Sequence, residues 1–390
     1  MTHPDTTTDA SRLSVTLSRR IRQRITQHGA LPFSDYMRMA LYEPGLGYYS
    51  AGLAKFGADG DFITAPELGA LFATGFAAAF VTVFPLVHRP VLLEIGAGSG
   101  AFARNALLAL HDAACLPSHY WILETSAHLR QVQKETLATL PEALRQRIRW
   151  LDEPPRSDFE GIVFANEVID ALPVEVFRRN RLAGTGYDRL HVTNKETGFT
   201  DHWRPMPASL ASRIPETCHA LPDGYRSEFL PQLTPWLKEI TSGLCRGAVF
   251  LVDYGYPRAD LYHPDRHTGT LVCHQRHQAR FDPYYAPGMQ DITAFVDFTA
   301  VAESLDAAGL RVTGFTTQGA FLLENGIEQS LGQADNSTYS AYYRRVTEFK
   351  QLVLPAEMGE KFKVMLGTRG LSEDEALAIP GFSSDLLYTL

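Results

Sequence analysis

The chain has 390 residues, and its 36 Lys and Arg against 44 Asp and Glu give a formal net charge of −8. This length exceeds the ~250–300 residues at which a single core stops growing, and 45% hydrophobic residues exclude general disorder. The negative charge argues against nucleic acid and anionic lipid as partners.

The cysteines are scattered and form no CxxC pair, which predicts a reducing compartment: the cytoplasm, or the mitochondrial matrix in a eukaryote. Residues 1–10 are polar and carry two acids, so we interpret them as a frayed leader without targeting character. The four cysteines are Cys115, Cys218, Cys245 and Cys273.

The N-terminal part predicts helices and a loop. Residues 11–40 carry apolar side chains at four-residue spacing, which predicts a helix, and the Gly- and Tyr-rich residues 42–62 predict an ordered loop. Two interpretations of this loop remain open, a lid over a site or packing of the N-terminal layer. The residues concerned are Tyr48, Tyr49, Asp61 and Glu67.

Residues 68–87 lack charge over a length that could span a membrane. We favour a buried helix, because the stretch contains Gly, Thr and Pro and has no basic cluster at either end. The S/T-x-x-E spacing of Thr64 and Glu67 predicts a capping box that starts this helix near Ala65.

From residue 91 on, short apolar runs alternate with helical stretches, which predicts a parallel sheet with helices on both faces. The predicted strands are 91–95, 121–125, 148–151, 161–166 and 248–254, with crossover helices at 101–113 and 126–140. Further predictions are a hairpin around residues 194–196, helices at 231–244 and 297–308, an antiparallel pair at 311–318 and a helical tail over 331–370.

The fold class is therefore α/β, a Rossmann-like sheet that is mostly parallel with an antiparallel closing strand. We divide the chain into an N-terminal helical or lid region (1–88), a sheet core (89–320) with an insertion at about 178–245, and a C-terminal helical extension (321–390).

A glycine-rich loop follows the first strand and opens a helix. Its glycines are Gly96, Gly98 and Gly100, with Ala97 between the first two. Such spacing permits a tight turn and close approach of a ligand, with helix N–H groups as donors, and it indicates an adenosine-containing cofactor. The same residues with Ala101 satisfy the dinucleotide fingerprint, so spacing alone leaves NAD and S-adenosylmethionine open.

Two acids narrow this choice. Glu94 precedes the first glycine by two residues, which resembles the E/D-x-G-x-G-x-G motif of class I S-adenosylmethionine methyltransferases, where the acid organises the loop. Glu124 ends the second strand, where a carboxylate can accept hydrogen bonds from both ribose hydroxyls. The alternative for Glu124 is an ordinary solvated acid.

The fourth strand ends in Asn166 and Glu167, at the edge where open α/β sheets bind ligands. If Glu167 starts a helical turn, Asp170 lies on the same face, and two carboxylates can address one cationic group. The alternative is that Asn166 caps a helix and Asp170 takes a structural hydrogen bond. No metal site is predicted, because His274 and His277 would face opposite sides of a strand.

Several segments together resemble the MidA family, also called the mitochondrial complex I assembly factor NDUFAF7 family. They are YEPGLGYYS, GDFITAPE, LEIGAGSG, NEVIDALPV, VDYGYP, PGMQDITAFVDFTA and MGEKFKVMLGTRG, in this order over roughly residues 30–370.

The resemblance implies S-adenosyl-L-methionine as cofactor and arginine N-methylation of a protein substrate such as a complex I subunit, without nucleic acid or stable membrane insertion. It implies that Gly96, Gly98 and Gly100 match the cofactor loop, Glu124 the ribose acid, and Asn166 with Glu167 the acidic loop near the methyl group. The N/D-P-P-Y signature is missing after residue 165, which counts against nucleobase or glutamine methylation. An NAD-dependent oxidoreductase and a non-catalytic assembly chaperone remain the alternatives.

Overall fold

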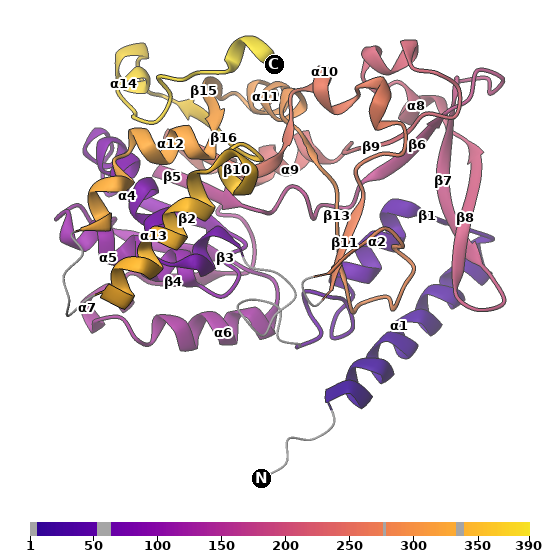
Figure 1. Ribbon diagram of the computed structural model, residues 1–390, viewed down its shortest axis with the longest axis horizontal. Helices are drawn as coiled ribbons and strands as arrows, with labels where there is room; N and C mark the ends of the chain where they lie inside the picture. The colour runs from indigo at the N-terminus through magenta and orange to yellow at the C-terminus, as the bar shows by residue number, and fades with distance from the viewer. Residues whose placement is uncertain (1–5, 53–63, 276–277, 333–338) are drawn as a thin grey trace. The chain divides into compact units, whose positions relative to one another are not determined.

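The computed structural model describes residues 6–52, 64–275, 278–332 and 339–390 (Figure 1). The chain divides into two compact units whose bounds differ from the three predicted parts, because the N-terminal residues group with the insertion. We call them the N-terminal unit, with Met1–Phe62, Ile169–Gln232 and Arg258–Asp297, and the sheet unit, with Ile63–Val168, Leu233–Pro257 and Phe298–Leu390.

The sheet unit is built on strands in the order β15-β16-β10-β5-β2-β3-β4 (Figure 1). The five strands from β10 to β4 are parallel, which confirms the predicted mostly parallel sheet. Its strands are β2 (Val91–Ile95), β3 (His119–Leu123), β4 (Ile148–Leu151), β5 (Phe159–Asn166), β10 (Leu244–Tyr256), β15 (Arg311–Thr317) and β16 (Phe362–Arg369).

The predicted helical tail is wrong over β16. This strand runs antiparallel to both of its neighbours, β10 and β15. The predicted antiparallel pairing of residues 311–318 therefore exists, but the strand that runs against the rest of the sheet is β16. Val364, Met365 and Leu366 are fully buried, as an interior strand requires on both faces. Lys363 and Thr368 interrupt the apolar run in the sequence, and α13 (Tyr339–Val353) is the helix that the predicted tail does contain.

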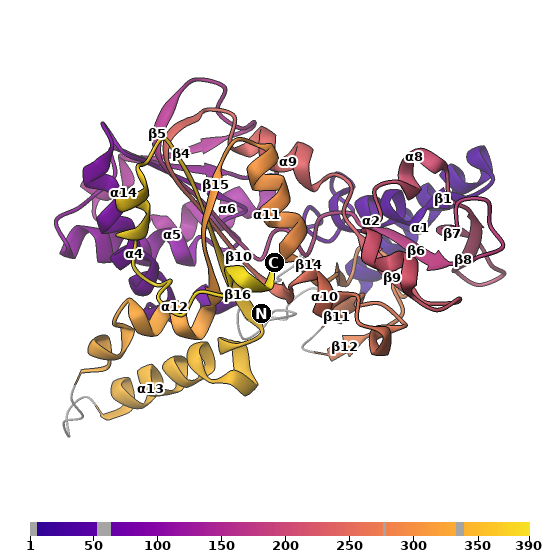
Figure 2. The same cartoon turned by 90° about the horizontal axis from the view of Figure 1, so that it is seen from above.

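Helices cover both faces of this sheet. Figure 2 shows α9 and α11 on one face and α4, α5 and α12 on the other. The predicted crossover helices are confirmed as α5 and α6, with their ends within three residues of the predicted bounds. The helices of the sheet unit besides α13 are α3 (Ala65–Leu68), α4 (Leu71–Val83), α5 (Ala101–Asp112), α6 (Ala127–Leu137), α7 (Glu142–Arg145), α9 (Leu233–Ile240), α11 (Phe298–Ala307), α12 (Gln318–Glu324) and α14 (Glu373–Leu377).

A helix begins at Ala65 as predicted, but it is the short α3, and the buried helix of the uncharged stretch 68–87 is α4, which begins at Leu71. Thr64 makes no side-chain capping bond, so the predicted capping box is wrong, and Gly69 separates α3 from α4. Glu348 instead accepts a hydrogen bond from the Leu71 N–H at 2.6 Å and satisfies the start of α4. Within the described part of the chain, no helix combines the length and apolar character that a membrane crossing needs.

Phenylalanine rings fill the space between α4, α5, α12 and the sheet. Phe102 stacks on Phe164 with ring centroids 4.1 Å apart, and Phe76 lies 5.0 Å from Phe164 and 4.5 Å from Phe321. These rings are almost completely buried, and large buried aromatics contribute strongly to core stability. These rings therefore pack α4, α5 and α12 against the fourth predicted strand, β5.

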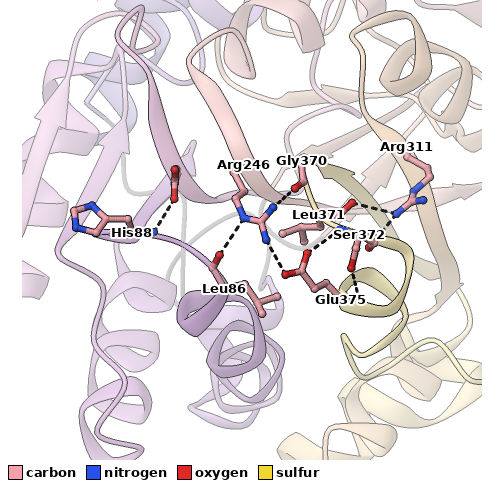
Figure 3. Close-up of polar contacts among 9 residues, drawn as sticks. Leu86, His88, Arg246, Arg311, Gly370, Leu371, Ser372 and Glu375 are labelled. Atoms are coloured by element: carbon pink, nitrogen blue, oxygen red, sulfur yellow. Dashed lines mark hydrogen bonds and ion pairs between the residues drawn. The ribbon is translucent and has the colours of Figure 1, made fainter.

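Arg246, at the start of β10, joins the C-terminal segment to the rest of the sheet unit (Figure 3). Its guanidinium donates to the Leu86 carbonyl at 3.0 Å, to the Gly370 carbonyl and to Glu375 at 2.7 Å. Glu375 also forms a capping box with Ser372 at the start of α14. A planar guanidinium with several fixed donors suits this three-way junction better than a lysine would.

The N-terminal unit combines helices with antiparallel strands in the order β1-β7-β6-β9, with β8 paired to β7. The predicted hairpin is confirmed as β7 and β8, whereas the predicted helix over 11–40 is interrupted at Gly29 (φ 75°). Its elements are α1 (Thr6–His28), β1 (Leu31–Pro32), α2 (Phe33–Tyr42), β6 (Glu175–Arg179), β7 (Tyr187–Asn194), β8 (Phe199–Pro205), α8 (Ala208–Ala211), β9 (Arg226–Phe229), α10 (Arg258–Leu261), β11 (Val272–Gln275), β12 (Gln278–Arg280), β13 (Asp291–Thr293) and β14 (Val296–Asp297).

Glu94 is a buried acid inside the otherwise apolar strand β2. Its side chain is 3% exposed and accepts a hydrogen bond from the Tyr120 hydroxyl at 2.7 Å. Burial raises the pKa of Glu94 to about 8, and the nearby Glu124 carboxylate acts in the same direction. In the unfolded chain a glutamate titrates near pH 4.3, so between these two pH values the folded state binds the additional proton.

The Glu94→Gln variant is therefore expected to lose less stability than the parent when the pH rises from 5 to 8. The slope of the unfolding free energy against pH should be reduced by up to about 1.4 kcal/mol per pH unit in this window, because glutamine does not titrate. Urea unfolding at several pH values measures it. The exposed Glu135→Gln on α6 is the control, and equal slopes for parent and Glu94→Gln would contradict the prediction.

Candidate functional site

The register of the sheet aligns the ends of three parallel strands. Ile95 pairs with Leu123 on one side and with Ala165 on the other. The residues that follow these three in the chain are Gly96, Glu124 and Asn166, all of them predicted site residues. The carboxyl edge of β2, β3 and β5 is thus the candidate site.

The glycine loop between β2 and α5 adopts conformations that favour glycine. Gly96, Gly98 and Gly100 all have positive φ, at 65°, 53° and 83°. A Cβ at Gly96 would lie 3.1 Å from Val168, and one at Gly100 would lie 3.3 Å from the Cα of Gln133. Side chains at these positions would therefore strain the backbone and crowd the neighbouring elements, and the bare loop leaves room for close approach of a ligand.

Glu124 follows β3 and is 7% exposed. One carboxylate oxygen accepts the Ser126 N–H at 2.8 Å, and the other accepts the Gln133 amide at 3.1 Å. Burial raises the pKa of Glu124, while these two donors and the charge of Arg130 act to lower it. Each carboxylate oxygen has a second lone pair, so Glu124 can still accept hydroxyl donors from a ligand.

Three contacts of the site were missed by the sequence analysis. The Gln133 amide also donates to the Gly98 carbonyl at 3.1 Å, and Ser99 donates to Glu67. The third contact is the bond from Tyr120 to Glu94. A polar residue within an amphipathic helix or a strand gives no signal in one sequence that its partner lies in a distant loop.

The predicted role of Glu94 in organising the loop stays a prediction. Its hydrogen bond to Tyr120 on β3 places the carboxyl group between the first two strands of the site. Glu94 pairs with Ile122 and Phe164 in the backbone register, so it lies one strand position before the last paired residue of β2.

Asn166 and Glu167 form a polar pair at the end of β5. The Asn166 amide donates to the Glu167 carboxylate at 3.1 Å, and the Glu167 N–H donates to the Val252 carbonyl at 2.9 Å. Among the described residues the Asn166 Oδ1 is buried and meets no hydrogen-bond donor. Glu167 adopts φ 53°, which is rare for a residue other than glycine and costs on the order of 1–3 kcal/mol. Strain and an unsatisfied buried acceptor together are typical of a binding site.

The predicted helical turn from Glu167 to Asp170 is wrong, because the left-handed conformation of Glu167 does not start a right-handed helix. Asp170 belongs to the N-terminal unit, where it is 5% exposed and its carbonyl accepts the Ala294 N–H. The structure therefore keeps Asn166 and Glu167 as adjacent residues of the sheet unit and assigns Asp170 to the other unit.

The residues predicted to form either a lid or a packed layer fall in different places. In the N-terminal unit Tyr48 is buried, and the Tyr49 hydroxyl donates to both oxygens of Asp291 at 3.0 Å. Asp61 and His277 lie outside the described residues. The lid and the packed layer both stay predictions.

The residues of the sheet unit fit an S-adenosylmethionine cofactor. The glycine loop offers bare backbone beside the start of α5, Glu124 offers a buried carboxylate for ribose hydroxyls, and the Asn166 oxygen lacks a donor. These groups come from the ends of three neighbouring strands. Residues 76–316 match the family model of S-adenosyl-L-methionine-dependent methyltransferases.

Solved structures and curated proteins extend this match. The chain is 36% identical to a Burkholderia thailandensis protein crystallised with S-adenosyl-homocysteine, over 100% of this chain and 99% of that one, with a TM-score of 0.90. It is 26% identical to the "Protein arginine methyltransferase NDUFAF7 homolog, mitochondrial" of Drosophila melanogaster, over 93% of this chain and 87% of the relative. The human protein arginine methyltransferase NDUFAF7 is 24% identical, over 88% and 81%.

The family match decides between the two cofactors that the glycine spacing left open, and it agrees with the resemblance to the NDUFAF7 family. The parallel sheet, the left-handed glycine loop and the carboxylate after β3 all lie within the matched residues. The chain belongs to the family of S-adenosyl-L-methionine-dependent methyltransferases.

Proposed function

We propose that this chain transfers a methyl group to an arginine side chain of a protein, a complex I subunit or a similar protein, in the reducing compartment that its cysteines indicate. The observation that carries the proposal is the Asn166–Glu167 pair at the carboxyl end of β5. The backbone of Glu167 is strained, and the buried Asn166 Oδ1 meets no hydrogen-bond donor among the described residues. The names of the curated relatives, which are protein arginine methyltransferases, support the same acceptor.

In the proposed site the glycine loop and Glu124 bind the cofactor. When bound, S-adenosylmethionine supplies a methyl group on a positively charged sulfur. The chain then has to bring the acceptor nitrogen into line and keep water out, and neither task needs a metal. The proposed cofactor residues are Glu94, Gly96, Ala97, Gly98, Gly100, Glu124 and Asn166.

Glu167 is the first candidate for the acceptor side. A guanidinium is protonated at any working pH and its lone pairs are delocalised, so it is a poor nucleophile. A carboxylate that binds it through charge-assisted hydrogen bonds can fix its plane, draw positive charge away from the attacking nitrogen and receive the proton that this nitrogen loses. Asn166 holds Glu167 through its amide at 3.1 Å.

Replacement of Glu124 by glutamine is expected to weaken S-adenosyl-homocysteine binding about 10- to 100-fold. The reason is that charged hydrogen bonds to the ribose contribute about 1.5–3 kcal/mol, which corresponds to this range. Isothermal titration calorimetry measures the dissociation constant. Glu135→Gln, an exposed glutamate of α6, is the control, and unchanged affinity in Glu124→Gln would exclude Glu124 as the ribose acid.

Replacement of Glu167 by glutamine is expected to reduce methyl transfer about 100-fold or more, because general bases contribute about 10²–10⁴-fold, while S-adenosyl-homocysteine affinity changes little. The assay incubates parent or variant with labelled S-adenosylmethionine and extract of cells that lack the protein. Mass spectrometry of the labelled proteins then identifies the methylated residue.

The exposed Glu142→Gln on α7 is the matched control for this assay. Transfer to lysine or to a small molecule would refute the proposed acceptor, and full activity of Glu167→Gln would refute the proposed role of its carboxylate.

A further inference from the structure

Gln133, on α6, is a polar residue of the site for which the proposed function gives no role. Its side chain is fully buried, although glutamine is usually exposed. Its amide nitrogen donates to the Gly98 carbonyl and to Glu124, both at 3.1 Å, and its amide oxygen accepts the Trp150 indole N–H at 2.9 Å. Both donor hydrogens and one acceptor position are thus used.

The orientation of this amide is fixed by its partners. The Gly98 carbonyl and a Glu124 carboxylate can only accept, and the Trp150 indole can only donate. A reversed amide would therefore lose all three bonds. Since Trp150 lies on β4, Gln133 joins this strand to the glycine loop after β2 and to the acid after β3.

Gln133 also packs closely against the glycine loop. A Cβ at Gly100 would lie 3.3 Å from the Gln133 Cα and 3.5 Å from its Cβ, so the loop packs directly on this residue. The Lys134 ammonium lies 5.7 Å from the centre of the Trp150 ring and adds a contact that holds the indole. Gln133 therefore sets the spacing between the glycine loop and Glu124, the two parts of the chain that are proposed to bind the cofactor.

We propose that Gln133 is a positioning residue for cofactor selectivity: it aims the Glu124 carboxylate at the ribose hydroxyls and fixes the distance from Glu124 to the glycine loop. This inference rests on the proposed role of Glu124. In this proposal Gln133 does not contact the cofactor. Its replacement is expected to reduce the discrimination between ribose and deoxyribose ligands. A residue that only stabilised the fold would weaken both ligands equally.

The test compares the affinities for S-adenosyl-homocysteine and its 2′-deoxyribose analogue by calorimetry. We expect the parent to prefer the ribose ligand at least about 10-fold, as one charge-assisted hydrogen bond allows. In Gln133→Met, which keeps the length and loses the donors, the preference should fall to about threefold or less. Retention of the full preference in Gln133→Met would overturn the proposal.

Two further variants keep the test decisive if Gln133→Met does not fold. Gln133→Glu replaces the amide donors by a titratable carboxyl group beside two acceptors. Because the ionised carboxylate cannot donate to Glu124, the ribose preference of this variant should fall as the pH rises from 6 to 8.5. A constant preference equal to that of the parent would overturn the proposal. Trp150→Phe removes the indole donor and keeps a ring, and its preference should lie between those of the parent and Gln133→Met. A preference unchanged in Trp150→Phe would contradict the fixed orientation of the amide.

Glu124→Gln separates the two hypotheses. If the parent shows no ribose preference, or if Glu124→Gln keeps it, the proposed role of Glu124 fails. If Glu124→Gln loses the preference and Gln133→Met keeps it, only the role of Gln133 fails.

Discussion

The candidate site depends on the backbone register of three parallel strands. With Ile95 opposite Leu123 and Ala165, the chain leaves β2, β3 and β5 at the same level. Since side chains alternate between the faces of a sheet, a slip of one residue in either pairing would turn the flanking polar groups to the opposite face. The hydrogen bonds across these strands therefore determine where Glu124 and Asn166 lie relative to the glycine loop.

A second feature of the site is the concentration of acids in a nonpolar environment. Glu94 and Glu124 are both buried, and burial raises the pKa of each. Neutral groups, the Tyr120 hydroxyl and the Gln133 amide, donate to them. A positively charged ligand stabilises the ionised form of such acids more strongly than it would at the surface, because the local dielectric is low. The cationic sulfur of the cofactor and the guanidinium of the proposed acceptor both meet this description.

The sequence alone predicted the parts of the fold that repeat a simple pattern. Runs at 91–95 and 148–151 became strands with the predicted bounds, because short runs that are mostly apolar favour strands. The interior strand β16 was missed because Lys363 and Thr368 break that pattern, and their burial depends on neighbours that are distant in the chain.

The same limit applies to the site. Glycine spacing and acids at strand ends marked the site, since both are local in sequence. Gln133 gave no such signal, because three contacts from three different elements define its position. The left-handed backbone of Glu167 was equally hidden, since helix propensity predicts nothing about a strained glutamate at a strand end.

The position of β16 has a consequence for biosynthesis. The strand lies between β10 and β15 in the sheet, yet it follows both of them in the chain and is therefore synthesised after them. Until then the growing polypeptide exposes two unpaired strand edges, which are sites of aggregation. Before β16 is added, the chain therefore contains the whole glycine loop and its acids but no continuous sheet.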